Sequence, residues 1–295
     1  MRFKRTRSQL AFDIINYAVL AVLAVSMLYP FINTLAISFA PRSEAYSMGL
    51  KLIPDQIIFD AYARVLGGGA IFSAYGVTIF RTVVGTTLNV FACFSAAFVL
   101  AKRGLPYKNG ITLFFVFTMF FSGGMIPTYM LIKNLHLINN VLVYIIPGIY
   151  SVWYMILMRN SIQALPEELE EAAVVDGATP MYMMMKIFLP LCMPIIATVA
   201  LWTAVGHWNA WFDAMIYITD QNKQVLQMIL RRIVLMEDMR KLIPGVELGT
   251  MANSLHSELS VKSATIIVTI GPIIAVYPFL QKYYVKGILV GSLKG

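Results

Sequence analysis

One acidic segment decides how the rest of the chain is interpreted: Leu165-Pro166-Glu167-Glu168-Leu169-Glu170-Glu171-Ala172-Ala173-Val174-Val175-Asp176-Gly177-Ala178-Thr179-Pro180. Pro166 suits the first position of a helix, and the glutamates after it favour the positive end of the helix dipole. Gly177 is placed as a C-terminal cap, because glycine adopts positive φ at low cost. Thr179 and Pro180 suit the N-cap and first position of a second helix. The segment therefore predicts a first helix of about eleven residues, about 16 Å long, then a glycine break and a second helix.

One side of the first helix is suited to close contact with another protein. Leu169, Ala172, Ala173 and Asp176 share that side at spacings of three and four residues. The paired alanines leave the backbone open to close approach, while the glutamates stay solvated. An acidic connector with no docking role is the alternative, and these features alone leave both interpretations open.

The composition surrounding this segment is that of a membrane protein. Of the 295 residues, 59% are hydrophobic and only 13% are charged, and the mean hydropathy is +0.72. Soluble domains carry about 25% charged residues. The net charge of +8 is spread in short clusters between apolar runs, with no basic aromatic-lined face for nucleic acid. Cys93 and Cys192 lie inside apolar runs and have no metal-binding or redox spacing.

Six long runs contain no Asp, Glu, Lys or Arg. They are Ile14–Pro41, Thr82–Ala101, Asn109–Ile132, Asn134–Met158, Ile187–Phe212 and Ser263–Gln281. Each is close to or longer than the ~20 residues that cross a bilayer as a helix. The sequence therefore predicts an all-α membrane protein with six transmembrane helices.

The short basic segments set the orientation. They are the N-terminal arm, the connection between spans two and three, and the tail, so both termini are expected in the cytoplasm. The predicted parts are a cytoplasmic arm (1–13), a six-span domain (14–286) with external loops (42–81 and 213–262) and a cytoplasmic loop (159–186), and a cytoplasmic tail (287–295).

Three further features belong to the segments beside the spans. The second external loop is predicted to contain a short amphipathic helix, because four of its apolar residues follow helical spacing: Leu226, Ile229, Leu230 and Ile233. Arg81 and Arg159 stand at the edges of spans two and four, where snorkelling to lipid headgroups is the expected role. Arg159 is also close enough to the acidic segment to pair with one of its glutamates.

A longer pattern connects the acidic segment to a known family. The spacing E-A-A, three residues, G, nine residues, I-x-L-P is met in full, by Glu171, Ala172, Ala173, Gly177, Ile187, Leu189 and Pro190. It resembles the signature of permease subunits in bacterial ATP-binding-cassette (ABC) importers, and the Asp176-Gly177-Ala178 version is similar to the carbohydrate group. Three other stretches resemble the branch that handles oligosaccharides and polysaccharides, alginate among them: Phe121-Ser122-Gly123-Gly124, Met158-Arg159-Asn160 and His207-Trp208-Asn209-Ala210-Trp211-Phe212.

The resemblance implies a type I ABC importer permease fold in the bacterial cytoplasmic membrane. In such permeases the acidic segment is the coupling helix, which sits in a groove of the ATPase subunit. The residues carried over for this role are Glu168, Leu169, Glu171, Ala172, Ala173, Asp176, Gly177, Ala178 and Pro190. The C-terminal sequence is similar to a tail that reaches the ATPases in this family, through Lys286, Gly287, Gly291, Lys294 and Gly295. The implied partners are two ATP-binding subunits, a second homologous permease, an external solute-binding protein, a carbohydrate and membrane lipid.

Candidate residues for the carbohydrate path cluster around span five. They are Trp202, His207, Trp208, Asn209 and Trp211. Aromatic faces stack on sugar rings and asparagine offers both a donor and an acceptor. Tryptophan and asparagine near the end of a span are also common interface anchors, so both roles stay open.

Other functions fit the sequence less well. The chain has no G-x-x-x-x-G-K-[S/T] motif, so it is expected to be non-catalytic, without a cofactor or metal of its own, with ATP and Mg²⁺ bound by partner subunits. An ion-gradient-driven secondary transporter is the first alternative, but the six runs contain no acidic residue for an ion site. The second alternative is an ABC permease for a solute that is not a sugar.

Overall fold

The computed structural model describes residues 7–49, 51–233 and 259–292, and within these ranges all regular structure is helical. The chain divides into two compact units, one made of residues 1–69 and 230–271, the other of residues 70–229 and 272–295. The first unit contains three helices besides the start of the last one: α1 (Arg7–Ser38), α2 (Arg42–Ala45) and α3 (Asp60–Gly67). A small apolar cluster joins α1 to α2 through Ala36, Ala40, Ala45 and Met48.

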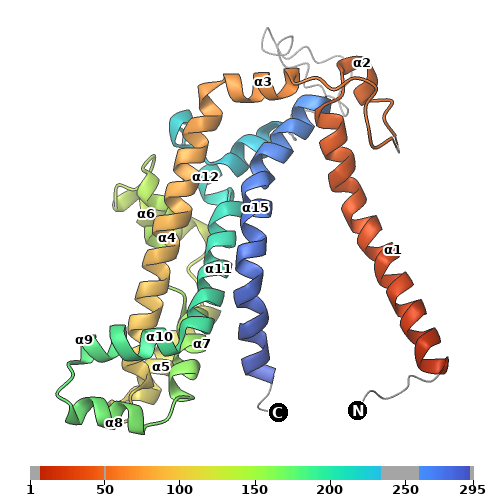
Figure 1. The fold of residues 1–295 in the computed structure, drawn as a ribbon. Coiled ribbons are helices and arrows are strands. Elements are labelled where there is room, and N and C mark those ends of the chain that lie inside the picture. Colours follow the sequence, from red (N-terminus) through yellow and green to blue (C-terminus); the bar gives the residue numbers. More distant parts are fainter. Residues whose placement is uncertain (1–6, 50, 234–258, 293–295) are drawn as a thin grey trace. The chain divides into compact units, whose positions relative to one another are not determined.

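The second unit carries the acidic segment and is shown in Figure 1. Its helices are α4 (Gly69–Ala101), α5 (Lys108–Phe120), α6 (Met125–Asn134), η1 (Val141–Tyr144), η2 (Ile146–Gly148), α7 (Val152–Gln163), α8 (Glu168–Val175), α9 (Pro180–Tyr182), the π-helical η3 (Met183–Phe188), α10 (Leu189–Leu191), α11 (Met193–Asn209), α12 (Phe212–Tyr217) and η4 (Gln221–Lys223). A further helix begins at 226 and is described to 233, where an amphipathic helix was predicted. The last helix is α15 (Leu259–Ser292).

The predicted spans correspond to these helices, although several are broken. Two helices of the described chain are long and apolar enough to cross a membrane by themselves, and three bent pairs raise the number to five. The bends are 109° between α5 and α6, 49° between η2 and α7, and 84° between α10 and α11. The sixth predicted run lies in α15, which includes a shorter apolar helix, Leu259–Ala275.

α4 begins at Gly69 and therefore extends into the segment 42–81, which was expected to be a loop. The second span was expected to start at Thr82 because the charge of Arg81 interrupts the apolar run there. That charge lies inside the second unit, where a carboxylate neutralises it, so it does not end the helix.

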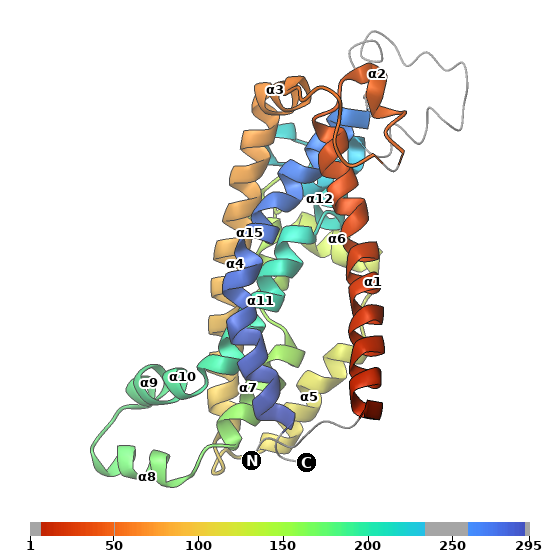
Figure 2. The same cartoon turned by 45° about the vertical axis from the view of Figure 1, so that its right-hand side comes forward.

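α4 supports the broken helices around it through a stripe of small and polar residues. Thr78, Arg81, Gly85, Asn89 and Cys93 recur at helical spacing and are all buried. A broken helix leaves backbone groups unpaired, and in an apolar setting each of these needs a partner. The stripe supplies several of the partners. Figures 1 and 2 show α4 and α11 running side by side, so the stripe is close to the breaks.

Two contacts illustrate this role. The amide nitrogen of Asn89 donates to the Gly148 carbonyl at 3.0 Å, at the end of η2, and its oxygen accepts from the Thr203 hydroxyl at 3.4 Å. The Cys93 sulfur accepts from the backbone amide of Ser151, the N-cap of α7, at 3.3 Å. The bend between η2 and α7 is therefore held from α4.

The main apolar cluster lies at the end of α4 near Ala101. It joins α4, α7, α8 and η3 through side chains that include Phe98, Met155, Met158, Ala173, Met183, Met184 and Phe188. The rings of Phe98 and Phe188 meet edge to face with centroids 5.3 Å apart. Four methionines fill this cluster, with Met155 and Met158 fully buried and Met183 and Met184 nearly so, while the neighbouring Met185 is exposed.

Candidate coupling surface and transport path

The first helix of the acidic segment forms, but it is shorter than predicted. α8 covers Glu168–Val175 rather than about eleven residues from Pro166. The residues before it make a tighter turn, in which the Glu170 amide donates to the Glu167 carbonyl at 2.9 Å. Bonds across three residues are typical of such a lead-in turn. Three glutamates still lie in the first turn of α8, where the helix dipole favours them.

The glycine break has the geometry that the sequence predicted. Gly177 has a φ of +75°. Its amide donates to the Val174 carbonyl at 3.0 Å, and the Ala178 amide donates to the Ala173 carbonyl at 2.9 Å. This pair of bonds is the Schellman motif, which closes a helix and needs a left-handed residue at its turn. The backbone of the segment therefore requires a left-handed residue at position 177, whatever contacts its side chain makes.

The predicted docking side of α8 is divided between the interior and the surface. Ala173 is only 6% exposed and belongs to the main apolar cluster. Leu169 is half-buried, while Ala172 and Asp176 are exposed. Val175 is 87% exposed, which is unusual for an apolar side chain on a short helix. α8 is thus anchored to its own chain by Ala173 and presents a mixed apolar and acidic face outward.

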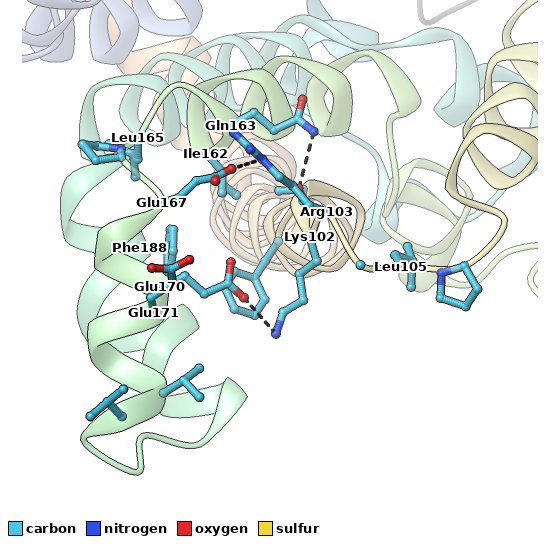
Figure 3. A pocket seen from close by; sticks show the side chains of 17 residues that line it. Lys102, Arg103, Leu105, Ile162, Gln163, Leu165, Glu167, Glu170, Glu171 and Phe188 are labelled. Atoms are coloured by element: carbon cyan, nitrogen blue, oxygen red, sulfur yellow. Dashed lines mark hydrogen bonds and ion pairs between the residues drawn. The ribbon is translucent and has the colours of Figure 1, made fainter.

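A pocket separates α8 from the connection between α4 and α5, as Figure 3 shows. Its volume is about 930 Å³. Two ion pairs bridge it, from Lys102 to Glu170 at 3.4 Å and from Arg103 to Glu167. Both pairs are partly exposed, so each contributes little to stability. Their effect is to hold the acidic helix beside the basic connection, with the pocket open between them.

The second helix begins as predicted. The Thr179 side chain caps it by accepting from the Tyr182 amide at 3.3 Å, and Pro180 is its first residue. Four of the other candidate residues lie around the loop: Glu168 and Glu171 are exposed on α8, Ala178 is half-buried, and Pro190 is exposed in α10.

The second helix does not continue into span five as a regular α-helix. Residues Met183–Phe188 are π-helical, and the Leu189 amide donates to the Met184 carbonyl, five residues back. The chain then bends by 84° before α11. Pro190 has no amide hydrogen for an α-helical bond, which accounts for the irregular backbone at this point. π-helical turns occur frequently at functional sites.

The C-terminal candidates lie at the edge of the described chain. The helix α15 contains Lys286, Gly287 and Gly291, and the structure describes its backbone at these positions. Lys294 and Gly295 lie outside the described residues. Their predicted contact with the ATPases stays a prediction.

The candidate path residues do not share one environment. Trp208 is only 9% exposed and packs with Ala74 and Leu226 in a small cluster. His207 is half-buried against Gly85, where an added Cβ would lie 2.5 Å from the imidazole Nε2. Trp211 is half-buried beside Phe212. These three side chains therefore pack within the unit.

Trp202 and Asn209 form the accessible part of the set. They are seven residues apart on α11 and so lie on one face of the helix, together with the exposed Val205. The Trp202 ring lies 6.2 Å from that of Tyr154. Asn209 accepts from Gln227 at 3.4 Å. An aromatic surface and an amide on one exposed face are suited to contact with a sugar.

A buried ion pair lies beside this region and was not predicted. Arg81 is 2% exposed, and its guanidinium binds both carboxylate oxygens of Asp213, at 3.2 and 2.5 Å. It also donates to the Ala210 carbonyl at 3.2 Å, and it lies 4.6 Å from the centre of the Tyr144 ring. The expected snorkelling of Arg81 is therefore wrong. Its role is to join α4 to the break between α11 and α12.

The sequence held a signal for this pair. Arg81 and Asp213 directly border two apolar runs that lie side by side in the structure, and their charges are opposite. Because each residue directly borders a charge-free run, neither belongs to a predicted span. The Arg159 guanidinium donates to the Thr112 hydroxyl at 3.1 Å and forms no described ion pair with a glutamate of the acidic segment, so the expected headgroup role of Arg159 stays a prediction.

Comparison with known proteins agrees with this arrangement. The family described as binding-protein-dependent transport system inner membrane component matches residues 67–290. The chain belongs to this family. It is therefore an ABC importer permease, and the resemblance found in its acidic segment is confirmed.

Individual relatives match almost the whole permease. Protein LplC of Bacillus subtilis is 39% identical over 98% of this chain and 97% of its own length. The polygalacturonan/rhamnogalacturonan transport system permease protein YtcP of Bacillus subtilis is 36% identical over 96% of this chain and 98% of its own. A chain from the crystal structure of a bacterial ABC transporter that imports the acidic polysaccharide alginate aligns with a TM-score of 0.85 and 30% identity. The alignment covers 96% of this permease and 99% of that chain. The type I ABC importer permease fold is thereby confirmed.

Proposed function

We propose that this permease forms half of a carbohydrate path in an ATP-driven importer, and that α8 couples it to an ATPase subunit. The observation that carries the coupling role is the division of α8 into an anchored and a free side. Ala173 is buried in the main apolar cluster, whereas Ala172 and Val175 are exposed. A helix with this division can be pushed from outside and move the helices on which it packs.

The exposed side of α8 has the character of a docking surface. Val174 and Val175 are 58% and 87% exposed, on a short helix that carries several glutamates. Exposed apolar side chains bordered by charges are typical of protein contacts. The proposed contact residues are Glu168, Leu169, Glu171, Ala172, Asp176, Gly177 and Ala178, with Ala173 acting from the buried side of α8 and Pro190 from the bend before α11.

The proposed assembly follows from the family. Two ATP-binding subunits hold ATP and Mg²⁺, a second homologous permease supplies the other half of the path, and an external binding protein delivers the solute. The permease itself is non-catalytic and has no cofactor. It spans the bacterial cytoplasmic membrane several times with both termini in the cytoplasm, so that α8 and the tail residues Lys286, Gly287, Gly291, Lys294 and Gly295 face the ATPases.

The proposed substrate is an oligosaccharide or polysaccharide. Two of the relatives support this class, one named for polygalacturonan and rhamnogalacturonan transport and one solved as an importer of alginate. Within this chain the exposed face of α11, with Trp202 and Asn209, is the part of the proposed path that suits sugar rings. Trp208, His207 and Trp211 support that face from within the unit.

The coupling role is tested with Gly177→Asp in the full importer, purified in mild detergent from its own cells. No described atom lies within 4 Å of a Cβ built at this position, and aspartate tolerates a left-handed backbone better than most residues. We therefore expect the variant permease to fold and to keep its permease partner. We expect the ATPase to be lost from the complex and uptake to cease.

Two control comparisons sharpen the result. Gly177→Asn has the same shape as Gly177→Asp without the charge, so it separates bulk from electrostatic repulsion. Ala172→Leu alters the exposed side of α8 and should release the ATPase while the permease stays intact. Ala173→Leu alters the buried side and should lower the stability of the permease. Wild-type uptake and ATPase retention by both Gly177→Asp and Ala172→Leu would contradict the coupling role.

The substrate class needs a separate assay. Cells expressing the importer are given labelled oligosaccharides, acidic and neutral, and uptake is compared with that of cells lacking the permease. Uptake should depend on ATP and survive collapse of the ion gradient. If only solutes that are not sugars are taken up, the carbohydrate assignment is wrong while the importer assignment stands.

A further inference from the structure

A second pocket lies between the start of α5 and the end of α7. Its volume is about 510 Å³. The described residues that line it are Lys108, Asn109, Thr112, Leu113, Val116, Arg159 and Gln163. This lining contains two cations and no carboxylate, which is the composition of an anion site.

Both cations are held in place by neutral groups. The Lys108 ammonium donates to the carbonyls of Ala101 and Lys102, each at 3.2 Å, and Arg159 donates to the Thr112 hydroxyl at 3.1 Å. Within the described chain neither cation forms an ion pair. Because both side chains line the same pocket, their like charges repel each other. An anion between them would relieve that repulsion.

One donor of a residue that lines the pocket lacks an acceptor. The Nε atom of Arg159 is buried and has no hydrogen-bond partner among the described residues. A buried donor without a partner is unfavourable, and more so when it carries charge. The start of α5 adds further donors, because its N-cap residue Tyr107 makes no side-chain cap. Free amides at a helix start favour negative charge.

The wall of the pocket indicates what kind of molecule carries the anion. Leu113 is 68% exposed, and Val116 continues the same face one turn later. α5 is an apolar helix of a membrane permease, so this face is suited to a hydrocarbon chain. A ligand with a phosphate at the cations and an acyl chain along Leu113 matches both parts of the pocket.

We propose that this pocket binds the headgroup phosphate of an anionic membrane phospholipid. Basic pockets between membrane helices bind anionic lipid headgroups by this combination of charge and apolar contact. The site is distinct from the α8 surface and from the exposed face of α11. It does not depend on the identity of the transported solute.

The test measures lipid retained by the assembled importer. Purified complexes are loaded with phosphatidylglycerol, exchanged into phosphatidylcholine nanodiscs, and the remaining phosphatidylglycerol is quantified by mass spectrometry. Each cation near a membrane surface contributes a factor of about five in affinity for anionic lipid. We therefore expect Arg159→Gln to retain about fivefold less phosphatidylglycerol than the wild type.

Three variants keep the test decisive. Asn109→Asp adds a carboxylate at the exposed mouth without removing either cation, and it should also reduce retention. Arg159→Lys keeps the charge and should retain more lipid than Arg159→Gln. Lys133→Gln removes an exposed cation at the end of α6 and should behave as the wild type.

A second arm separates lipid from free anion. Inorganic phosphate is added during the exchange at increasing concentration. Displacement of phosphatidylglycerol only at high phosphate supports a lipid site, whereas displacement at low phosphate identifies a free phosphate site and overturns the proposal. Equal retention by the wild type, Arg159→Gln and Asn109→Asp also overturns it.

Discussion

The Arg81–Asp213 pair makes a prediction that depends on the unequal burial of its two partners. The Arg81 side chain is 3% exposed and the Asp213 side chain is 26% exposed. The perturbation is to neutralise each partner alone, with Arg81→Met and Asp213→Asn, and then both together. The first change removes the buried cation, and the second leaves that cation without its counterion.

The burial difference sets the expected magnitudes. Loss of the Asp213 charge leaves a guanidinium in the interior, and stranding a buried charge costs about 3–5 kcal/mol. Loss of the Arg81 charge leaves a carboxylate that water partly reaches, so the cost is closer to that of a lost hydrogen bond, about 1–3 kcal/mol. The double variant strands no charge. Its destabilisation should therefore be close to that of Arg81→Met alone and well below the sum of the two single changes.

The assay is thermal stability of the assembled importer in detergent, followed as the fraction that remains monodisperse after heating. We expect the wild type to have the highest apparent Tm. Arg81→Met and the double variant should share a lower value, and Asp213→Asn should have the lowest. The reasoning would be refuted if the apparent Tm of the double variant fell by as much as the decreases of the two single variants added together. It would also be refuted by single variants that melt with the wild type, because the pair would then be dispensable.

Three further substitutions test contacts made by α4 and the coupling segment. Gly85→Val should destabilise the permease by about 1–3 kcal/mol, because its side chain would overlap the His207 ring, and adding His207→Ala should restore much of the loss in the same thermal assay. Thr78→Val should cost about 1–3 kcal/mol by leaving the Leu226 amide without its 3.0 Å acceptor, and Thr78→Ser should not; equal melting of the two would contradict this. Thr179→Ala should cost about 1 kcal/mol by removing the cap of α9, with Thr179→Ser as the control, and hydrogen exchange of the coupling segment should report the loss.

The parts of the coupling segment that were predicted correctly are governed by local geometry. Gly177 terminates α8 and Thr179 starts α9, because capping depends on residues within a few positions of each other. The apolar runs were recognisable for a similar reason, since a continuous stretch of about 20 apolar residues has few alternatives to a membrane helix. Family resemblance is the basis of the coupling role that we propose for the segment.

The features that were missed depend on contacts between distant residues. Nothing local distinguishes Ala172 from Ala173, and only the position of the apolar cluster shows that one is exposed and the other buried. The Arg81–Asp213 pair joins residues 132 positions apart. Each charge by itself suggests the end of a span, and only the contact between them shows that Arg81 is buried against a carboxylate. The π-helical stretch before Pro190 likewise depends on how its methionines pack.

These observations together indicate how movement of α8 reaches the rest of the permease. The covalent route runs through a π-helical stretch and an 84° bend, and such irregular backbone does not behave as a stiff rod. The route through packing is shorter, because Ala173 shares one close-packed cluster with Phe98 of α4 and Met155 of α7. Close-packed interiors transmit displacement. α4 in turn holds the breaks of α7 and α11 through Asn89 and Arg81. If α8 acts as the proposed coupling helix, we expect a push on it to pass mainly from side chain to side chain into α4. The bend before α11 would let span five turn while α4 keeps its contacts with the broken helices.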